Sequence, residues 1–242
     1  NIDERLTQLD EKILAEISPR FKETDDITEY NQLKMLSAFI KNGVTESAFA
    51  GSTGYGYDDR GREILERVMA DAMGAEGSLI RHNFVSGTHT LTVALFGLLR
   101  PGDKVLVLTG RPYDTITGVF GIDEKTDGSL ADFGVEYHEI ALLPDGTPDK
   151  AAIKKELAAN AYKMAYIQRS RGFSTRPSLT IEKIRELCDI VRETSPKSII
   201  MVDNCYGEFT EKQEPCEVGA DIIAGSLIKN PGGGIAPTGG YI

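Results

Sequence analysis

Hydrophobic and polar positions follow two different patterns, which change near residue 50. Between residues 2 and 17, apolar side chains recur at helical spacing. Pro19 is expected to end this first helix, because proline lacks the amide proton that the next turn needs. A second helix is expected over residues 28–41, where an Asn-Gly pair follows as a stop signal. The pattern therefore predicts a helical N-terminal segment over residues 1–50.

From residue 51 onward, short apolar runs alternate with helical stretches. Helices are expected near residues 63–73, 88–99, 149–160 and 180–194. Strands are expected in the runs 78–85, 104–110, 134–142, 163–168, 198–204 and 220–226. Several of these runs are uninterruptedly apolar, which is typical of parallel strands buried on both faces. The sequence thus predicts an α/β fold with a mainly parallel sheet and helices on both faces.

Composition and charge narrow the classes of protein. Of 242 residues, 40% are hydrophobic and 26% are charged, which argues against a disordered chain. The net charge of −10 argues against a nucleic-acid binder and against attachment to an anionic membrane. No apolar run approaches the roughly 18 residues of a spanning helix, and the N-terminus has no signal-peptide core. A cytoplasmic protein is predicted.

Cysteine and histidine give no sign of a metal site. The three cysteines contain no CxxC pair, so a zinc ribbon or a redox pair is not expected. The three histidines lack the spacing of metal-binding motifs such as HExxH. We therefore predict no metal.

Two charged residues follow neighbouring apolar runs near the chain end. Asp203 is the last residue but one of the run 198–204, and Lys229 comes just after the run 220–226. Taken alone, Asp203 could fix a loop and Lys229 could be a solvated surface residue. A parallel crossover, however, would bring both to the edge of the sheet where ligands bind. An amine beside a carboxylate suits pyridoxal phosphate, whose aldehyde forms an imine with lysine and whose ring nitrogen needs an acidic partner.

A phosphate cradle and a stacking ring are also predicted. Ser86, Gly87 and Thr88 follow a strand-like run and open a helix, whose N-terminal amides favour phosphate. The alternative is an ordinary helix N-cap. Ser226, three residues before the lysine, is a further phosphate ligand candidate. Tyr113 follows the run 104–110 and either covers the cofactor ring or packs in its loop.

The run DNCYGEFTEKQEPCEVGADIIAGSLIK, residues 203–229, resembles the cofactor segment of the fold-type I enzymes of cysteine and methionine metabolism. These include the cystathionine lyases and methionine gamma-lyase. More narrowly, the chain resembles the aluminium resistance, or methionine gamma-lyase-like, branch over the segments GSTGYGYDDRGRE, FVSGTHT, GRPYDT, IQRSRGFSTRPSLTI and SLIKNPGGGIAPTGGY. The resemblance runs from residue 51 to 242, and more loosely through the N-terminal helices.

This resemblance implies a fold-type I, PLP-dependent transferase-like large domain over residues 51–242, with a sheet of the seven-stranded type. Members of the family carry a smaller C-terminal domain that supplies an arginine for the substrate carboxylate. The sequence ends before such a domain, in a glycine-rich run followed by the start of a strand. We therefore expect a fragment of a longer protein.

The resemblance also implies residue roles. Lys229 would be the Schiff-base lysine and the proton shuttle, and Asp203 would pair with the pyridinium. Tyr113 would stack on the ring at the catalytic centre. The phosphate would be held by Ser86, Gly87, Thr88 and Ser226. An N-terminal loop of the family reaches the phosphate of the neighbouring subunit, and the matching residues here are Tyr55 or Tyr57 with Arg60. A homodimer or homotetramer with a shared site is therefore expected.

The chain departs from the better-known lyases at two places. Ile228 stands where they have a threonine before the lysine, and the run 168–174 replaces an ESPTNP-like motif. Three arginines in and after that run, Arg169, Arg171 and Arg176, either face the substrate carboxylate or form a solvated surface.

The function predicted from the sequence is a PLP-dependent carbon–sulfur lyase that acts on a sulfur-containing amino acid. One alternative is another reaction of the same cofactor, such as transamination or racemisation, because fold and cofactor do not fix the reaction. A second alternative is a non-catalytic PLP-binding, structural or regulatory protein. A dinucleotide-binding Rossmann enzyme is disfavoured, since no GxGxxG motif follows the first strand.

Overall fold

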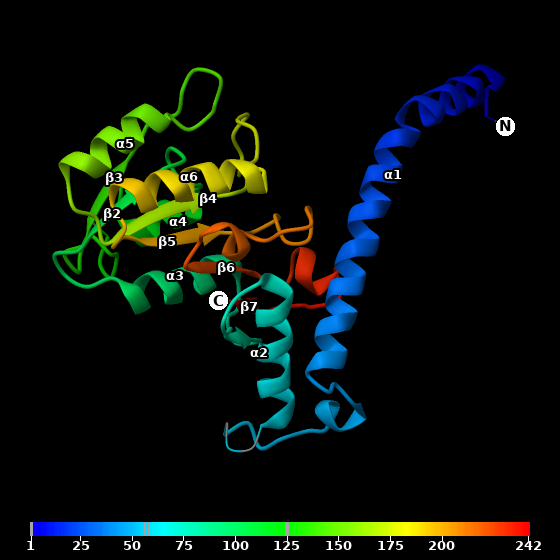
Figure 1. Cartoon of the computed structure of the whole chain (residues 1–242), viewed down its shortest axis with the longest axis horizontal. Coiled ribbons are helices and arrows are strands. Elements are labelled where there is room, and N and C mark those ends of the chain that lie inside the picture. Colours follow the sequence, from blue (N-terminus) through cyan, green and yellow to red (C-terminus); the bar gives the residue numbers. More distant parts are fainter. Residues whose placement is uncertain (1, 56, 58, 124–125) are drawn as a thin grey trace.

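The computed structural model describes residues 2–55, 57, 59–123 and 126–242, and its centre is a seven-stranded sheet (Figure 1). The strand order is β1-β7-β6-β5-β4-β2-β3. Strands β2 to β6 run parallel, whereas β7 pairs antiparallel with both β1 and β6. The predicted mainly parallel sheet is confirmed. The strands are β1 (Ile80–Arg81), β2 (Lys104–Val107), β3 (Glu136–Glu139), β4 (Met164–Gln168), β5 (Ile199–Asp203), β6 (Ile222–Ser226) and β7 (Gly240–Tyr241).

Helices cover both faces of the sheet, as predicted. On one face, α3 (Gly87–Leu98) and α4 (Asp114–Phe120) pack against side chains such as Val105. On the other, α5 (Lys150–Ala159), α6 (Ile181–Thr194) and the end of α2 (Arg60–Met73) pack against side chains such as Leu106. Neighbouring residues of one strand thus pack into the cores on opposite faces of the sheet, because successive side chains point to opposite faces.

Two elements differ from the sequence expectation near the site. The strand expected over residues 78–85 shrinks to β1, because the chain turns after Arg81 to enter α3. The stretch after β2, where the sequence pattern predicts neither a helix nor a strand, contains α4, a helix of seven residues. Two threonines, a valine and a glycine, all of low helix propensity, stand among its seven residues, so its sequence lacks a helical signal. Ile116 and Phe120, four residues apart, nevertheless face the core and fix it there.

The prediction that Pro19 ends a first helix is wrong. Pro19 lies inside a single helix, α1 (Glu4–Lys41), which covers both predicted helices. The helix is exposed there, so water can hydrate the Ala15 carbonyl that the proline deprives of its donor. Figure 1 shows a bend in the N-terminal half of α1, as a proline causes. The short helix η1 (Glu46–Phe49) follows.

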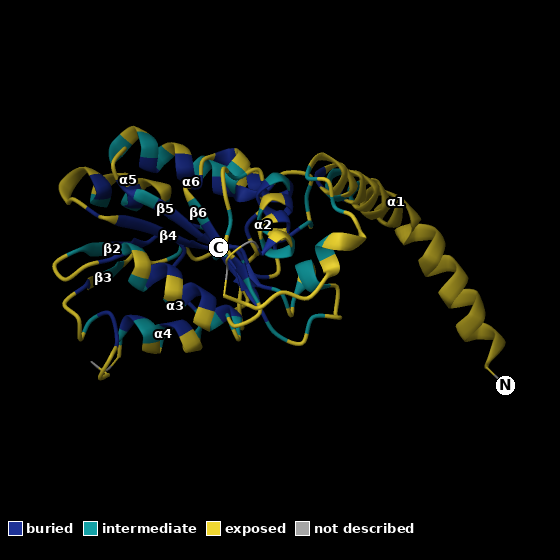
Figure 2. Cartoon of the chain, turned by 90° about the horizontal axis from the view of Figure 1, so that it is seen from below, coloured by how far each residue is buried: buried dark blue, intermediate teal, exposed yellow. Residues whose placement is uncertain are grey.

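Among the described residues, the contacts of helix α1 with the rest of the chain come from its C-terminal half, and its N-terminal half projects into solvent (Figure 2). Ala38 packs against Ile64 and Val68 of α2. The Asn31 amide donates hydrogen bonds to the carbonyl oxygens of Phe209 and Glu211. No helix among the described residues is long and apolar enough to cross a membrane.

Candidate active site

A pocket of about 480 Å³ opens at the carboxyl ends of β2, β4, β5 and β6. Its lining includes Tyr113 from the segment after β2, Asp203 from the end of β5 and Lys229 from the segment after β6. Strands β5 and β6 are direct neighbours, with Asp203 opposite Ala224. The expectation that a parallel crossover brings Asp203 and Lys229 to one edge is therefore confirmed.

Asp203 is buried with one carboxylate oxygen unused. The residue is 1% exposed, and its Oδ1 accepts a hydrogen bond of 3.1 Å from the amide of Cys205. Its Oδ2 has no hydrogen-bond partner among the described residues. Burial raises the pKa of this carboxyl, although the nearby Lys229 ammonium opposes the effect. A buried acceptor without a partner is costly, so this oxygen is suited to a cationic N–H donor of a ligand.

Lys229 is half-buried and lies on an aromatic face. Its Nζ is 4.1 Å from the centroid of the Tyr206 ring. Burial alone would lower the pKa of the amine, but the Cys205 thiol and the Asp203 carboxylate outweigh burial and raise that pKa. The structure therefore stabilises Lys229 as an ammonium ion beside the unpaired oxygen of Asp203.

The N-terminus of α3 faces the same amine. A Cβ added to Gly87 would lie 3.3 Å from Cys205 Sγ, 3.3 Å from Ser226 Cβ and 3.6 Å from Lys229 Nζ. Ser86 is the N-cap of the helix, and its Oγ accepts a hydrogen bond of 3.1 Å from the amide of His89. The bare Gly87 lets backbone and ligand approach closely at a helix end that favours anions.

Hydroxyl groups surround this helix end. Thr88 Oγ1 lies 2.9 Å from Thr115 Oγ1 and 3.4 Å from the Tyr113 hydroxyl. Ser226 is fully buried, and its Oγ accepts a 3.3 Å hydrogen bond from the amide of Ile228. The structure thus brings Gly87 and Ser226 together near Lys229, with Ser86 and Thr88 at the same helix end.

Gln168, at the end of β4, holds the backbone of Tyr113 in place. Its amide donates a 3.0 Å hydrogen bond to Gln168 Oε1, and Gln168 Nε2 donates to the carbonyl of Ser170. Burial and the nearby Asp203 charge raise the pKa of the Tyr113 hydroxyl, which stays neutral. The aromatic side chain thereby has a set position on the pocket wall.

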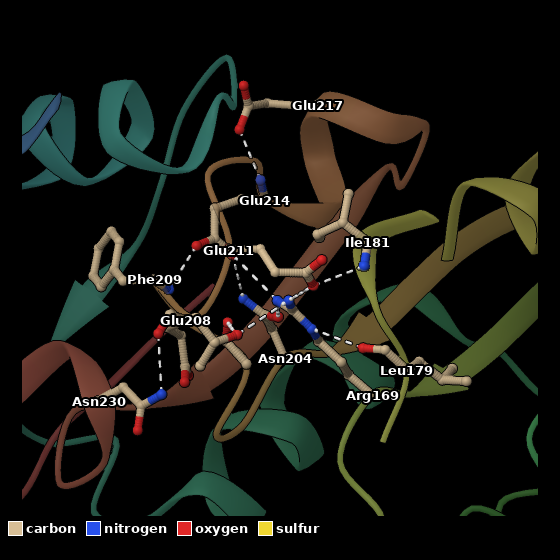
Figure 3. A network of polar contacts seen from close by, with 12 residues as sticks. Arg169, Leu179, Ile181, Asn204, Glu208, Phe209, Glu211, Glu214, Glu217 and Asn230 are labelled. Atoms are coloured by element: carbon tan, nitrogen blue, oxygen red, sulfur yellow. Dashed lines mark hydrogen bonds and ion pairs between the residues drawn. The ribbon is translucent and has the colours of Figure 1, made fainter. Parts of the chain in front are cut away.

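The three arginines predicted as one basic cluster have different surroundings. Arg169 is 3% exposed and donates to Asn204 Oδ1 and Glu211 Oε2, at 2.8 and 2.9 Å (Figure 3). Arg176 is also buried, and it donates to three backbone carbonyls. For these two residues both predicted alternatives are wrong, because their guanidinium groups bind the protein itself. Arg171 alone lines the pocket.

The residues proposed for a neighbouring subunit lie apart from this pocket. Tyr55 and Tyr57 are 83% and 85% exposed, and Arg60 is exposed at the start of α2. None of them lines the pocket that contains Lys229. Their expected contact with a second subunit stays a prediction.

These features match the chemical groups of pyridoxal phosphate. Asp203 Oδ2 offers an acceptor for a pyridinium, Lys229 offers an amine for an aldehyde, and the α3 N-terminus offers donors for a phosphate. Gly87 leaves the room that a side chain would fill. The residues present therefore fit this cofactor.

A family model described as methionine gamma-lyase matches residues 6–242. The chain belongs to the methionine gamma-lyase family. A carbon–sulfur lyase involved in aluminium resistance from Clostridium novyi has a solved structure that superposes with a TM-score of 0.94 at 48% identity, over 99% of this chain and 57% of that one. The predicted resemblance to the aluminium resistance branch is confirmed.

The chain is also similar to two further proteins. The uncharacterized protein YnbB of Bacillus subtilis is 46% identical over 232 residues, which are 96% of this chain and 55% of the relative. The PLP-dependent protein YhfS of Escherichia coli shares the fold, with a TM-score of 0.66 at 18% identity over 89% of this chain and 54% of that one. The fold is thus that of the fold-type I enzymes. The chain spans less than two thirds of each of these relatives.

Three residues in or beside the pocket were not singled out by sequence reasoning. Cys205 and Tyr206 line the pocket from the turn after Asp203. Gln168, which accepts a hydrogen bond from the Tyr113 amide, ends the neighbouring strand β4 opposite Asp203. The position of each just after or at the end of a central strand was the available signal. Residue type gave no signal for Cys205, because cysteine is among the residue types most often buried, and the burial of Gln168 could not be read from its type, because glutamine is mostly exposed.

Proposed function

We propose that the chain is the cofactor-binding part of a PLP-dependent carbon–sulfur lyase that acts on a sulfur-containing amino acid. The observation that carries the proposal is that Lys229 lines the same pocket as Asp203, whose buried Oδ2 has no hydrogen-bond partner among the described residues. The membership of the family supports the reaction class, and the name of the Clostridium novyi relative agrees with it.

Each residue would have a distinct task. Lys229 would anchor the aldehyde, Asp203 would keep the ring nitrogen protonated, and the α3 N-terminus with Thr88 and Ser226 would hold the phosphate. Tyr113 would cover the ring. When bound, the cofactor supplies an electron sink for a carbanion next to the substrate nitrogen.

The groups around Lys229 determine the pKa of its amine. An amine works as a base only when its ammonium form is not over-stabilised. Here the Cys205 thiol and the Asp203 carboxylate hold its pKa above the ordinary value. Pairing Asp203 with a pyridinium would cancel the carboxylate charge that Lys229 feels, and so lower the pKa of the amine. Lys229 would then be better able to take up and return a substrate proton.

The proposal extends to the assembly. Tyr55 or Tyr57, together with Arg60, would reach the phosphate of a second subunit, so that a homodimer is the smallest active unit and a homotetramer is expected. Their exposure leaves them accessible for this contact. The cytoplasmic location stays a prediction from the sequence.

The test is a reaction screen of the full-length protein with PLP and sulfur-containing amino acids. The proposal expects release of a thiol together with ammonia and either pyruvate or 2-oxobutyrate, lost in Lys229→Ala. Amino-group transfer to a 2-oxo acid without thiol release would favour a transaminase instead. Absence of turnover with every sulfur-containing amino acid in a PLP-loaded oligomer would favour the non-catalytic alternative.

A further inference from the structure

The turn after β5, residues 204–211, holds two side-chain-bearing residues in a left-handed backbone conformation. Tyr206 has a φ of 67° and Phe209 has a φ of 60°. This region of the backbone map favours glycine, so both residues are under strain. Strained residues persist only where the surrounding structure holds them in place. The contacts around this turn therefore decide where its side chains point.

The inner side of the turn is held by Glu214, which is fully buried. Its Oε1 accepts a 2.7 Å hydrogen bond from the Phe209 amide, and its Oε2 accepts one of 3.1 Å from Asn204 Nδ2 (Figure 3). Arg169 Nη1 donates in turn to Asn204 Oδ1 at 2.8 Å. The start of the turn is thus tied to the segment that follows it and to the end of β4.

The outer side of the turn is held by helix α1 through Asn31. The Asn31 Nδ2 donates to the carbonyl of Phe209 at 3.1 Å and to that of Glu211 at 3.0 Å, besides that of Ile27 in its own helix. Asn31 is one of the two buried residues of α1, and the other, Ala38, packs on α2. One buried amide therefore bridges two carbonyls of the strained turn.

The surface contacts between α1 and this segment are looser. Lys34 Nζ donates to the carbonyl of Lys212 at 3.2 Å and lies 5.7 Å from the centroid of the Phe209 ring. Lys212 Nζ lies 5.4 Å from the centroid of the Tyr30 ring. Both ring distances are near the limit of a cation–π contact. Asn31 is thus the buried polar contact by which α1 holds the turn.

The same turn meets the segment of the cofactor lysine at two points. The Tyr206 ring lies under the Lys229 amine, with its centroid 4.1 Å from Nζ. The carbonyl of Glu208 accepts a 3.0 Å hydrogen bond from Nδ2 of Asn230, the residue after the lysine (Figure 3). A shift of the turn would therefore move an aromatic face away from the amine.

We propose that Asn31 is a positioning residue for Lys229. By holding the carbonyls of Phe209 and Glu211, it keeps the turn in the conformation that places the Tyr206 ring against the amine. Helix α1, whose N-terminal half projects into solvent, thereby acts on the candidate active site. The importance of this contact for catalysis rests on the proposed function, in which Lys229 anchors the cofactor.

The effect of Asn31 on the amine must pass through other groups, because an amide carries no charge. The titratable residues that line the pocket with Lys229 are Tyr113, Asp114, Arg171, Asp203, Cys205 and Tyr206. Asp203 belongs to β5, and the buried Cys205 packs beside the Gly87 end of α3. Tyr206 is the exposed, left-handed residue among them, so its ring is the group that a loosened turn would displace.

The test measures the pKa of the Lys229 amine in the full-length protein freed of PLP. The pH dependence of acetylation by acetic anhydride gives this pKa, read by mass spectrometry of the peptide that contains Lys229. Asn31→Leu has a similar size but no donor, and it should lower the pKa by about 0.4 to 0.7 unit, as the loss of a partly exposed cation–π contact implies. Combining it with Tyr206→Leu should add no further shift beyond that of Tyr206→Leu alone, because both changes remove the same contact.

Asn42→Leu is the matched control in the same helix. The Asn42 Nδ2 donates to Ala38 and Asp71 and not to the turn, so its loss should reduce stability and leave the pKa of Lys229 unchanged. Asn31→Ser provides a milder second variant, because its short hydroxyl cannot bridge two carbonyls and the space it leaves admits water. It should also lower the pKa of the lysine.

An unchanged pKa of Lys229 in the Asn31 variants would overturn the proposal and leave Asn31 a role in stability alone. Shifts that add in the double variant would also overturn it, because Asn31 would then act by a route other than Tyr206. An equal shift in Asn42→Leu would assign the effect to a general loosening of α1. The visible band of the wild-type protein with PLP reports the cofactor site separately: its absence overturns the proposed function, while the acetylation still decides the role of Asn31.

Discussion

The ammonium nitrogen of Lys229 lies 4.1 Å from the centre of the Tyr206 ring, three residues after Asp203 in the chain. Tyr206 has a φ of 67°, a left-handed backbone conformation that costs energy in a residue with a side chain. The turn after β5 thus presents an aromatic face to the amine and a carboxylate to the same pocket. One short segment controls both the position and the protonation of the lysine.

Replacing Tyr206 tests the aromatic contact. Tyr206→Leu should lower the pKa of the Lys229 amine by less than about one unit, because a cation–π contact at a partly exposed site stabilises an ammonium by about 0.5–1 kcal/mol. The measurement is the pH dependence of the rate of PLP attachment to Lys229. Tyr206→Phe keeps the aromatic face and should leave the pKa unchanged; an equal shift in both variants would refute the contact.

A methyl group at Gly87 tests the cradle at the α3 N-terminus. Gly87→Ala places a Cβ 3.3 Å from both Cys205 Sγ and Ser226 Cβ, where the cofactor would approach. We expect PLP affinity to fall at least about tenfold, or 1.4 kcal/mol. Gly97→Ala is the control in the same helix, because its Cβ would meet nothing within 4 Å. It should keep PLP affinity and raise stability by about 0.5–1 kcal/mol.

Glu208, labelled in Figure 3, is a buried acid that should give the protein a pH-dependent stability. It is 1% exposed, Oε1 accepts a 2.8 Å hydrogen bond from the Tyr241 hydroxyl, and Oε2 has no partner among the described residues. Burial, helped by the Glu214 and Asp203 charges, raises its pKa from 4.5 to about 7. The folded protein therefore holds this proton more tightly than the unfolded chain does.

Unfolding should release that proton between pH 4.5 and pH 7, so the free energy of unfolding falls as the pH rises through this range. The loss attributable to Glu208 is about 3 kcal/mol. Glu208→Gln stays neutral, so its stability relative to wild type should rise by a similar amount from pH 4.5 to 8. Denaturant unfolding at several pH values measures this difference. A difference that does not change with pH would show that Glu208 ionises normally.

Arg169 should contribute to the stability of the fold. Arg169→Met leaves the buried Glu214 without its cationic neighbour, which costs about 3–5 kcal/mol of unfolding free energy for a buried pair. Arg185→Met on α6 is the control, since its guanidinium contacts only surface groups and should cost less than about 1 kcal/mol. Equal losses in the two variants would contradict the structural role of Arg169.

The central sheet followed from the sequence because its buried strands are uninterrupted apolar runs. Asp203 and Lys229 were predictable for the same reason, since each stands at or just after such a run. The sequence failed where a local rule met an unusual environment. Pro19 was expected to end a helix, but solvent around α1 satisfies the freed carbonyl and the helix continues.

The partners of buried side chains were the other feature that the sequence could not predict. The burial of Arg169 and Arg176 depends on acceptors from Asn204, Glu211 and a loop backbone, which residue type and spacing do not encode. Packing of β4 against β5 brings Asn204 to Arg169, whereas Arg176 is buried because the loop after β4 folds its own carbonyls around the guanidinium. Among the described residues, the Arg171 guanidinium in the same run has no such partner, and Arg171 lines the pocket.

The most direct test of the central claim is the visible absorption spectrum of the full-length protein with PLP, beside that of Lys229→Ala. The account predicts a visible band of lysine-bound cofactor in wild type and none in the variant. Borohydride treatment of wild type should abolish the band and leave the cofactor covalently attached to the peptide that contains Lys229. A full-length oligomer without this band, or a cofactor attached to a different lysine, would contradict the account.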